Sequence, residues 1–141
     1  MYPEALEQYQ KVLQMFPDDF MIYSSLGKLY LLKEDGEKAM VAFQRSLEIN
    51  PKQAEPLFFI GVLYAYLLKG QWGNAVKDYT DSIKIDPHYV VAYYGRAYAY
   101  DKKGDFKKAL RDYEKSVEID PSYEQKTRDR IQAIKRVSGK R

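Results

Sequence analysis

The sequence contains no cysteine and only one histidine, His88, among its 141 residues. The absence of cysteine excludes disulfide bonds, zinc sites with thiolate ligands and cysteine nucleophiles. The chain also lacks the glycine-rich phosphate-binding loops and the Gly-x-Ser-x-Gly motif of nucleophilic hydrolases. A metal site needs several ligands close together, and one histidine beside a proline does not supply them. We therefore expect no cofactor, no metal and no enzymatic activity.

Long hydrophobic runs are missing as well. The longest one, residues 57–68, has twelve residues, whereas a membrane-spanning helix needs about 18 or more. The start of the chain, Met-Tyr-Pro-Glu-Ala-Leu-Glu, shows no basic stretch followed by an apolar one, so no signal peptide is visible. These features predict a protein without a membrane span and favour a cytoplasmic location.

Charge is unevenly distributed, although the net charge is only +3. From Glu124 to the end, seven Lys or Arg residues face two acidic ones, which gives +5 and leaves −2 for the rest of the chain. Apolar residues make up 45% of the sequence, a proportion typical of a folded domain, and the length suits one domain. Tyrosine is unusually frequent, with 14 residues, and needs a role in packing or binding.

Four prolines recur along the chain at spacings of 34, 36 and 34 residues: Pro17, Pro51, Pro87 and Pro121. Each has an alanine twelve residues earlier, an aromatic residue eight earlier and a small or modest residue five earlier. These three sets are Ala5, Ala39, Ala75 and Ala109; Tyr9, Phe43, Tyr79 and Tyr113; and Val12, Ser46, Ser82 and Ser116. A fixed period over several registers indicates structural repeats.

A second pattern precedes each of the last three alanines, with residues at i, i+3, i+4 and i+7 that form the packing face of an amphipathic helix. Its members are Tyr23, Leu26, Gly27 and Tyr30; Leu57, Ile60, Gly61 and Tyr64; and Tyr93, Arg96, Ala97 and Tyr100. Gly or Ala at the third place lets two helices approach closely. Arg96 stands where the other units have an aliphatic residue, so we expect it to be paired or to extend its charge to solvent.

Together the two patterns predict eight helices, at about 3–15, 20–33, 37–49, 53–68, 73–85, 89–102, 106–118 and 122–137. They resemble the aromatic–Leu–Gly–Tyr…Ala…aromatic…Pro signature of the tetratricopeptide repeat (TPR) family. The resemblance covers residues 2–121 and implies an all-α fold, a right-handed α-solenoid of helix-turn-helix units. The expected units are a half repeat at 1–17, full repeats at 18–51, 52–87 and 88–121, and a capping helix with a basic tail at 122–141.

The first helix departs from a regular array, because it would be an outer helix without its inner partner. Its apolar face, which includes Leu6, Tyr9 and Leu13, is then partly uncovered. This arrangement indicates either a piece of a longer array or a surface for self-association, such as a homodimer or a domain swap.

The unit 52–87 departs by two extra residues, which we expect to lengthen the end of its inner helix around residues 67–69. Trp72 then takes the place that Phe106 has in the next unit. The insertion is either a tolerated change at a surface turn or an extension of a groove wall.

Two carboxylates, Asp78 and Asp81, lie at i and i+3 on a predicted helix and raise the question of acid–base catalysis. By the resemblance they belong to an outer, solvent-facing helix. We therefore interpret them as hydrated surface residues rather than as a catalytic pair.

By the resemblance, the inner helices line a concave groove, and we predict that this groove binds a peptide or a segment of a protein partner. Relatives that grip the C-terminal carboxylate of chaperones use Lys, Asn and Arg there, a pattern that Ser24, Phe59 and Gly95 do not meet. Aromatic side chains instead predict a ligand with apolar or aromatic anchors, with Lys28 and Lys102 at the rim. The predicted groove residues are Ser24, Lys28, Phe58, Phe59, Val62, Tyr66, Tyr94, Tyr98, Asp101, Lys102 and, from the cap, Arg128.

Two alternatives stay open beside this prediction. Several of the aromatic residues, Phe59 above all, could fill space between neighbouring inner helices instead of contacting a ligand. Binding of single-stranded nucleic acid ranks third, since most tyrosines occupy repeat positions and a basic tail is more often a solvated end.

Overall fold

A computed structural model describes residues 2–68 and 70–139, so Lys69 of the insertion and Lys140 and Arg141 of the basic tail lie outside the described residues. Within the described ranges the chain is helical and has no strand, which confirms the predicted all-α fold. The helices are α1 (Tyr2–Met15), α2 (Phe20–Leu32), α3 (Gly36–Ile49), α4 (Ala54–Tyr66), α5 (Trp72–Ile85), α6 (Val90–Lys103), α7 (Phe106–Ile119) and α8 (Glu124–Gly139), with a short 3₁₀ turn at Pro121–Tyr123.

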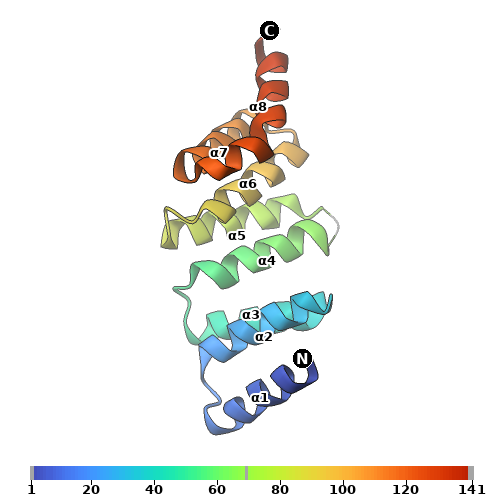
Figure 1. Cartoon of the computed structure of the whole chain (residues 1–141), viewed down its shortest axis with the longest axis vertical. Helices are drawn as coiled ribbons and strands as arrows, with labels where there is room; N and C mark the ends of the chain where they lie inside the picture. Colours follow the sequence, from blue (N-terminus) through green and yellow to red (C-terminus); the bar gives the residue numbers. More distant parts are fainter. Residues whose placement is uncertain (1, 69, 140–141) are drawn as a thin grey trace.

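The helices stack one upon another from the N-terminus to the C-terminus and form an α-solenoid (Figure 1). Helices α2, α4 and α6, called the inner helices below, each pack against the outer helix that follows them, α3, α5 and α7. Each pair also contacts the next, α3 with α4 and α5 with α6. The core is therefore a continuous series of layers between helices rather than one central cluster.

Small residues on the inner helices let the aromatic rings of the outer helices come very close. A Cβ atom added to Gly27 would lie 2.5 Å from the ring of Phe43, and one added to Gly61 would lie 2.8 Å from the ring of Tyr79. The ring of Tyr79 also lies against Gly95 on the next inner helix, where an added Cβ would be 2.8 Å away. The recurring aromatic thus fixes the spacing within a pair and between neighbouring pairs.

Buried serines tie the end of an outer helix to the start of its inner helix. The Ser46 hydroxyl donates to the carbonyl oxygen of Phe20 at 2.8 Å, and the Ser82 hydroxyl donates to that of Ala54 at 2.7 Å. These bonds satisfy the buried hydroxyl groups, which would otherwise destabilise the core. They explain the serine five places before the proline in the first two full repeats, whereas Ser116 in the last repeat donates to Tyr113 within α7.

The insertion does not lengthen the inner helix, contrary to our expectation. Helix α4 ends at Tyr66, and Leu67 and Leu68 form a turn instead. Leu67 packs on Gly36, where an added Cβ would lie within 2.3 Å of its side chain. The extra residues therefore fold back onto the neighbouring pair, because an apolar side chain gains more by covering that glycine than by pointing to solvent.

Helix α8 differs from the inner helices in its orientation. In Figure 1 it rises steeply out of the stack instead of lying across it. Ile134 and Thr127 are buried against the last pair, while Val137 is exposed. The helix covers the end of the core through Ile134, at an angle that the sequence pattern did not indicate.

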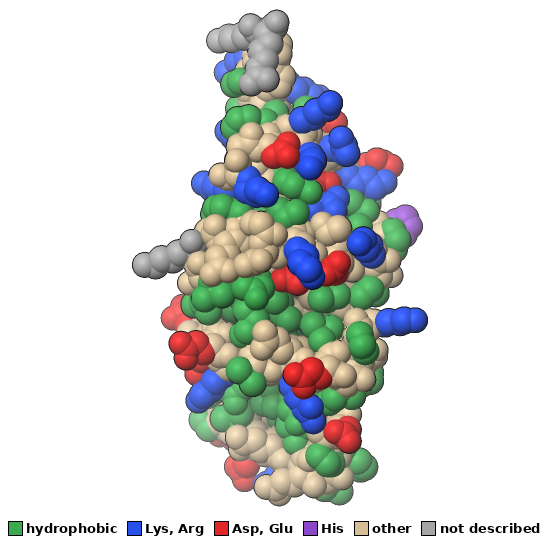
Figure 2. Space-filling view, turned by 180° about the vertical axis from the view of Figure 1, so that it is seen from behind, with side chains coloured by type: hydrophobic (Ala, Val, Ile, Leu, Met, Phe, Trp, Pro, Cys, Tyr) green, Lys and Arg blue, Asp and Glu red, His purple; other side chains and the backbone are tan. Residues whose placement is uncertain are grey.

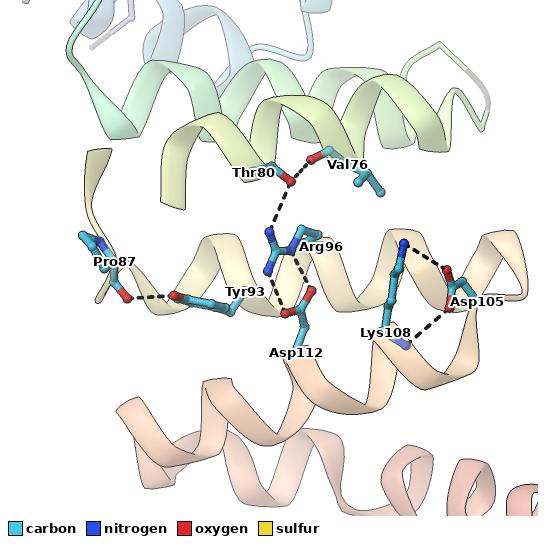
Figure 3. A network of polar contacts seen from close by, with 8 residues as sticks. All are labelled: Val76, Thr80, Pro87, Tyr93, Arg96, Asp105, Lys108 and Asp112. Carbon is cyan, nitrogen blue, oxygen red and sulfur yellow. Dashed lines mark hydrogen bonds and ion pairs between the residues drawn. The ribbon is translucent and has the colours of Figure 1, made fainter. Parts of the chain in front are cut away.

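Arg96 is paired, and it connects three helices (Figure 3). Its guanidinium donates to both carboxylate oxygens of Asp112 on α7, at 2.7 and 2.9 Å, and to the hydroxyl of Thr80 on α5 at 3.2 Å. The Asp112 side chain is only 3% exposed. Burial lowers the pKa of Arg96, but the hydrogen bonds to Asp112 raise it on balance, so Arg96 stays charged.

The first repeat suggests a test of this pair, since Leu26 and Ala42 occupy the places of Arg96 and Asp112. We expect Arg96→Leu to lower the free energy of unfolding by about 3–5 kcal/mol, because Asp112 loses its counter-charge while buried. Adding Asp112→Ala restores the apolar pair of the first repeat and should recover most of the loss. Urea unfolding followed by circular dichroism measures both variants, and a double variant as unstable as Arg96→Leu would contradict this account.

Candidate functional site

The inner helices carry the predicted groove residues, and the middle of this surface is aromatic. The ring of Tyr66, at the end of α4, stacks on Tyr98 of α6 with 5.8 Å between ring centroids and 22° between ring planes. Trp72, at the start of α5, meets the edge of Tyr98 at 5.9 Å. Tyr66 remains 61% exposed. A stack of rings with one face open to solvent can receive an apolar or aromatic side chain.

Phe58 and Phe59 lie between helix pairs more than in the groove. Phe59 stacks on Phe43 of the core at 5.2 Å, and Phe58 packs against Tyr79 at 5.7 Å and Tyr89 at 5.7 Å. Both phenylalanines are half-buried. Their main contribution is therefore to fill space between layers, the alternative that the sequence left open for Phe59.

Near the N-terminal repeats the polar groups of the groove are occupied within the chain. Ser24 is buried, and its hydroxyl shares a 2.6 Å hydrogen bond with the hydroxyl of Ser46, so this predicted groove residue is not available to a partner. Lys28 forms an ion pair with Glu55 on α4 at 2.9 Å. A hollow of about 300 Å³ between α2 and α4 contains these side chains together with exposed Met21.

At the C-terminal end the groove opens into a cleft of about 530 Å³, called the C-terminal cleft below. It lies where α6, the start of α7 and α8 meet. Its lining residues are aromatic or charged: Tyr94, Tyr98, Asp101, Lys102, Phe106, Tyr113, Lys126 and Arg130. Four of them, Tyr94, Tyr98, Asp101 and Lys102, were predicted to line the groove.

Asp101 is the acidic centre of the C-terminal cleft, and its carboxylate is fully engaged. Arg130 donates to both of its oxygens at 2.5 Å, and the hydroxyl of Tyr113 donates to one of them at 3.1 Å. Burial and the Asp101 charge raise the pKa of Tyr113, so this hydroxyl keeps its proton. The hydrogen bonds to Asp101 raise the pKa of Arg130, which stays charged.

The structure corrects the residue that the capping helix contributes. Arg130, not the predicted Arg128, enters the cleft, whereas Arg128 pairs with Glu124 at 3.4 Å and lies beside α7. The prediction expected a capping helix and took Arg128 as its contribution to the groove, whereas the tilt of α8 (Figure 1) turns the face with Arg130 to the cleft. The sequence showed that Trp72 and Phe106 are equivalent in the repeat, but it did not predict that they line the groove. No pattern in the sequence indicated that Lys126 lines the C-terminal cleft.

The comparisons with known proteins agree with this architecture. Sequence models described as "Tetratricopeptide repeat" match residues 2–54 and 90–123, and one described as "TPR repeat" matches residues 64–104. The chain belongs to the tetratricopeptide repeat family. Proteins of this family serve as scaffolds that bind other proteins.

Among curated proteins, this TPR chain is 27% identical over 88 residues to the general transcriptional corepressor ssn6 of Schizosaccharomyces pombe. It is 30% identical over 83 residues to a UDP-N-acetylglucosamine–peptide N-acetylglucosaminyltransferase of Giardia intestinalis. These matches cover 62% and 59% of the chain but only 8% and 6% of the two relatives. The second relative is an enzyme, but only a small part of it matches.

Solved structures share the fold over nearly the whole TPR chain. MamA superposes with a TM-score of 0.85 at 23% identity and covers 98% of this chain and 79% of its own. The first TPR of Spaghetti (RPAP3), bound to the HSP90 peptide SRMEEVD, superposes with a TM-score of 0.77 at 18% identity, covering 85% and 93%. Identities this low show a common fold and no more.

The first helix of the TPR array keeps a partly open apolar face. Leu6, Tyr9 and Leu13 are half-buried, and no residue of α1 is buried. Self-association through this face stays a prediction.

Outside the groove, Asp78 and Asp81 on α5 differ from the hydrated pair that we expected. Asp78 is half-buried, and burial, together with the Asp81 charge, raises its pKa to about 6 although Lys77 lowers it. Lys77 pairs with Asp81 at 3.0 Å. Asp78 occupies the place of Asp112 in the next repeat, but Ile60 stands where Arg96 would pair with it.

No group of acidic or histidine side chains able to hold a metal ion occurs within residues 2–68 and 70–139. No helix in the described part of the chain combines the length and the apolar character that crossing a membrane requires.

The raised pKa of Asp78 predicts a stability that depends on pH. Its folded pKa of about 6 lies above the ordinary unfolded value, so the favourable contribution is complete below about pH 4 and is lost as the pH rises through 6. Asp78→Asn should therefore gain stability over the unmodified chain between about pH 5 and about pH 8, by about 1 kcal/mol after solvent screening. Thermal unfolding across this range tests it, with exposed Asp129→Asn as control. If the difference in stability between Asp78→Asn and the unmodified chain stayed constant with pH, the raised pKa of Asp78 would be contradicted.

Proposed function

We propose that the groove binds an extended or helical segment of a protein partner, with an apolar or aromatic side chain anchored on Tyr66 and Tyr98. The observation that carries this proposal is the exposed ring of Tyr66, held in a stack with Tyr98 beside Trp72. Exposed aromatic rings are costly in water, and rings already held by neighbours lose little entropy when a ligand covers them.

The turn that follows Tyr66 adds to this surface. Leu67 and Leu68 are both partly exposed, so the wall next to the aromatic stack is apolar. Exposed apolar surface that is continuous with aromatic rings is typical of protein interfaces. The insertion therefore extends the groove wall, which is the second of the two roles considered for it.

The ligand differs from the chaperone tail bound to the RPAP3 repeat. Ser24 is buried and Lys28 is paired with Glu55, so the two residues nearest the usual clamp are occupied within this chain. The aromatic stack favours an apolar anchor instead of a terminal carboxylate at this point of the groove.

We infer binding without catalysis. The carboxyl group with a raised pKa, Asp78, lies on an outer helix with Lys77 and Asp81 as its charged neighbours, and His88 is exposed in a turn. Acid–base catalysis needs several such groups converging on one substrate, and these groups do not converge.

Substitution of Tyr66 tests the binding proposal. The probe is a set of peptides selected from a random-sequence display library by binding to the unmodified chain. Tyr66→Ala removes an exposed ring, so we expect helical circular dichroism to persist and peptide affinity to fall about tenfold or more, or about 1.4 kcal/mol. Fluorescence anisotropy measures the affinities.

Val41→Ala on α3 is the matched control, because it truncates an exposed apolar side chain on an outer helix. It should bind the selected peptides as the unmodified chain does. Peptides that bind Tyr66→Ala as tightly as the unmodified chain, or a library that yields no binder, would count against the groove.

A further inference from the structure

The C-terminal cleft carries positive charge that the chain itself does not neutralise. Three cations line it, Lys102, Lys126 and Arg130, and one carboxylate, Asp101. Arg130 forms a bidentate ion pair with the carboxylate of Asp101. No ion pair within the described part of the chain involves Lys102 or Lys126, so neither ammonium group is in direct contact with a carboxylate. Outside the cleft, hydrogen bonds from Ser122 and, as a smaller cause, the charge of Lys126 lower the pKa of Asp120.

Aromatic rings hold both ammonium groups at the cleft. The Nζ atom of Lys102 lies 5.3 Å from the ring centre of Tyr98, and the Nζ atom of Lys126 lies 4.9 Å from that of Tyr123. Tyr123 in turn packs edge-on against Tyr94 at 5.5 Å. A ring attracts an ammonium group without using its three N–H donors, so both lysines can still donate to an anion.

We propose that the C-terminal cleft binds the carboxylate side chain of an acidic residue in the same partner segment that anchors on Tyr66 and Tyr98. The inference rests on the proposed function and adds the charge and the direction of the ligand. Tyr98 belongs both to the aromatic stack and to the cleft, so the acidic residue lies next to the apolar anchor.

The N-terminal end of the groove offers no similar site, so the ligand should bind in one orientation, with its acidic residue at the C-terminal end. There the ammonium group of Lys28 is already paired with Glu55 at 2.9 Å. Basic side chains also gather over the upper, C-terminal part of the face seen in Figure 2, so this end of the molecule is generally positive. The acidic part of the ligand is therefore drawn to the end near α8.

A peptide fits these charges better than a nucleic acid. A single strand carries a phosphate at every nucleotide and needs cations along its whole path. Of the groove cations, Lys102 and Lys126 lack an ion pair and both lie at the C-terminal cleft, whereas the rest of the groove presents Tyr66, Val62 and the Lys28–Glu55 pair.

The test uses the peptides selected for binding to the unmodified chain. We expect these peptides to carry Asp or Glu on one side of the apolar anchor and to bind more weakly at high salt. Lys102→Gln with Lys126→Gln should weaken an acidic peptide about tenfold. The same variant should bind the peptide's Asn or Gln analogue as the unmodified chain does. Lys84→Gln with Lys107→Gln is the control, as it removes the same charge from exposed sites outside the cleft.

Each outcome bears on a different claim. The acidic site would be overturned if Lys102→Gln with Lys126→Gln lost the same affinity for the acidic peptide as for its neutral analogue. It would also be overturned if this variant and the control lysine variant lost the same affinity for the acidic peptide. Both results would leave the aromatic anchor intact. A peptide affinity that Tyr66→Ala leaves unchanged would instead overturn the proposed function. Tighter binding of a single-stranded oligothymidine, lost in Lys102→Gln with Lys126→Gln, would assign the cleft to phosphate and also overturn the inference.

Discussion

The structure depends on the close contact between inner and outer helices at Gly27 and Gly61. The rings of Phe43 and Tyr79 occupy the space that side chains at these glycines would need. Because Tyr79 also touches Gly95, one ring sets the distance between three helices. This spacing places the ends of α4 and α6 so that Tyr66 can stack on Tyr98. The candidate site thus follows from how closely the helices pack.

The sequence predicted the repeats and their packing well because these depend on local periodicity. The equivalents of Ala39, Phe43 and Ser46 recur in every full repeat, where they pack helices closely or hydrogen-bond between them. The helix bounds agree within two residues, and α4 ends at Tyr66 instead of extending to residue 68. That end depends on the contact of Leu67 with Gly36, a tertiary interaction that periodicity does not encode.

The candidate site was predicted only in part for a similar reason. Tyr66, Tyr98, Asp101 and Lys102 lie at repeat positions and could therefore be named from the sequence as candidates. The contribution of the capping helix could not, because burial of Ile134 and Thr127 sets the tilt of α8, and this tilt brings Arg130 rather than Arg128 to Asp101. Position within a repeat identifies a groove residue only while the helix lies in register with the stack.

We propose that a partner segment lies along the inner helices with its apolar anchor on the aromatic stack. The most direct test is nuclear magnetic resonance of the complex with a selected peptide, observing contacts between protons of the peptide and of the protein. We expect contacts from the peptide's apolar side chain to the rings of Tyr66 and Tyr98. Contacts confined to the outer helices α3 and α5 would contradict the account.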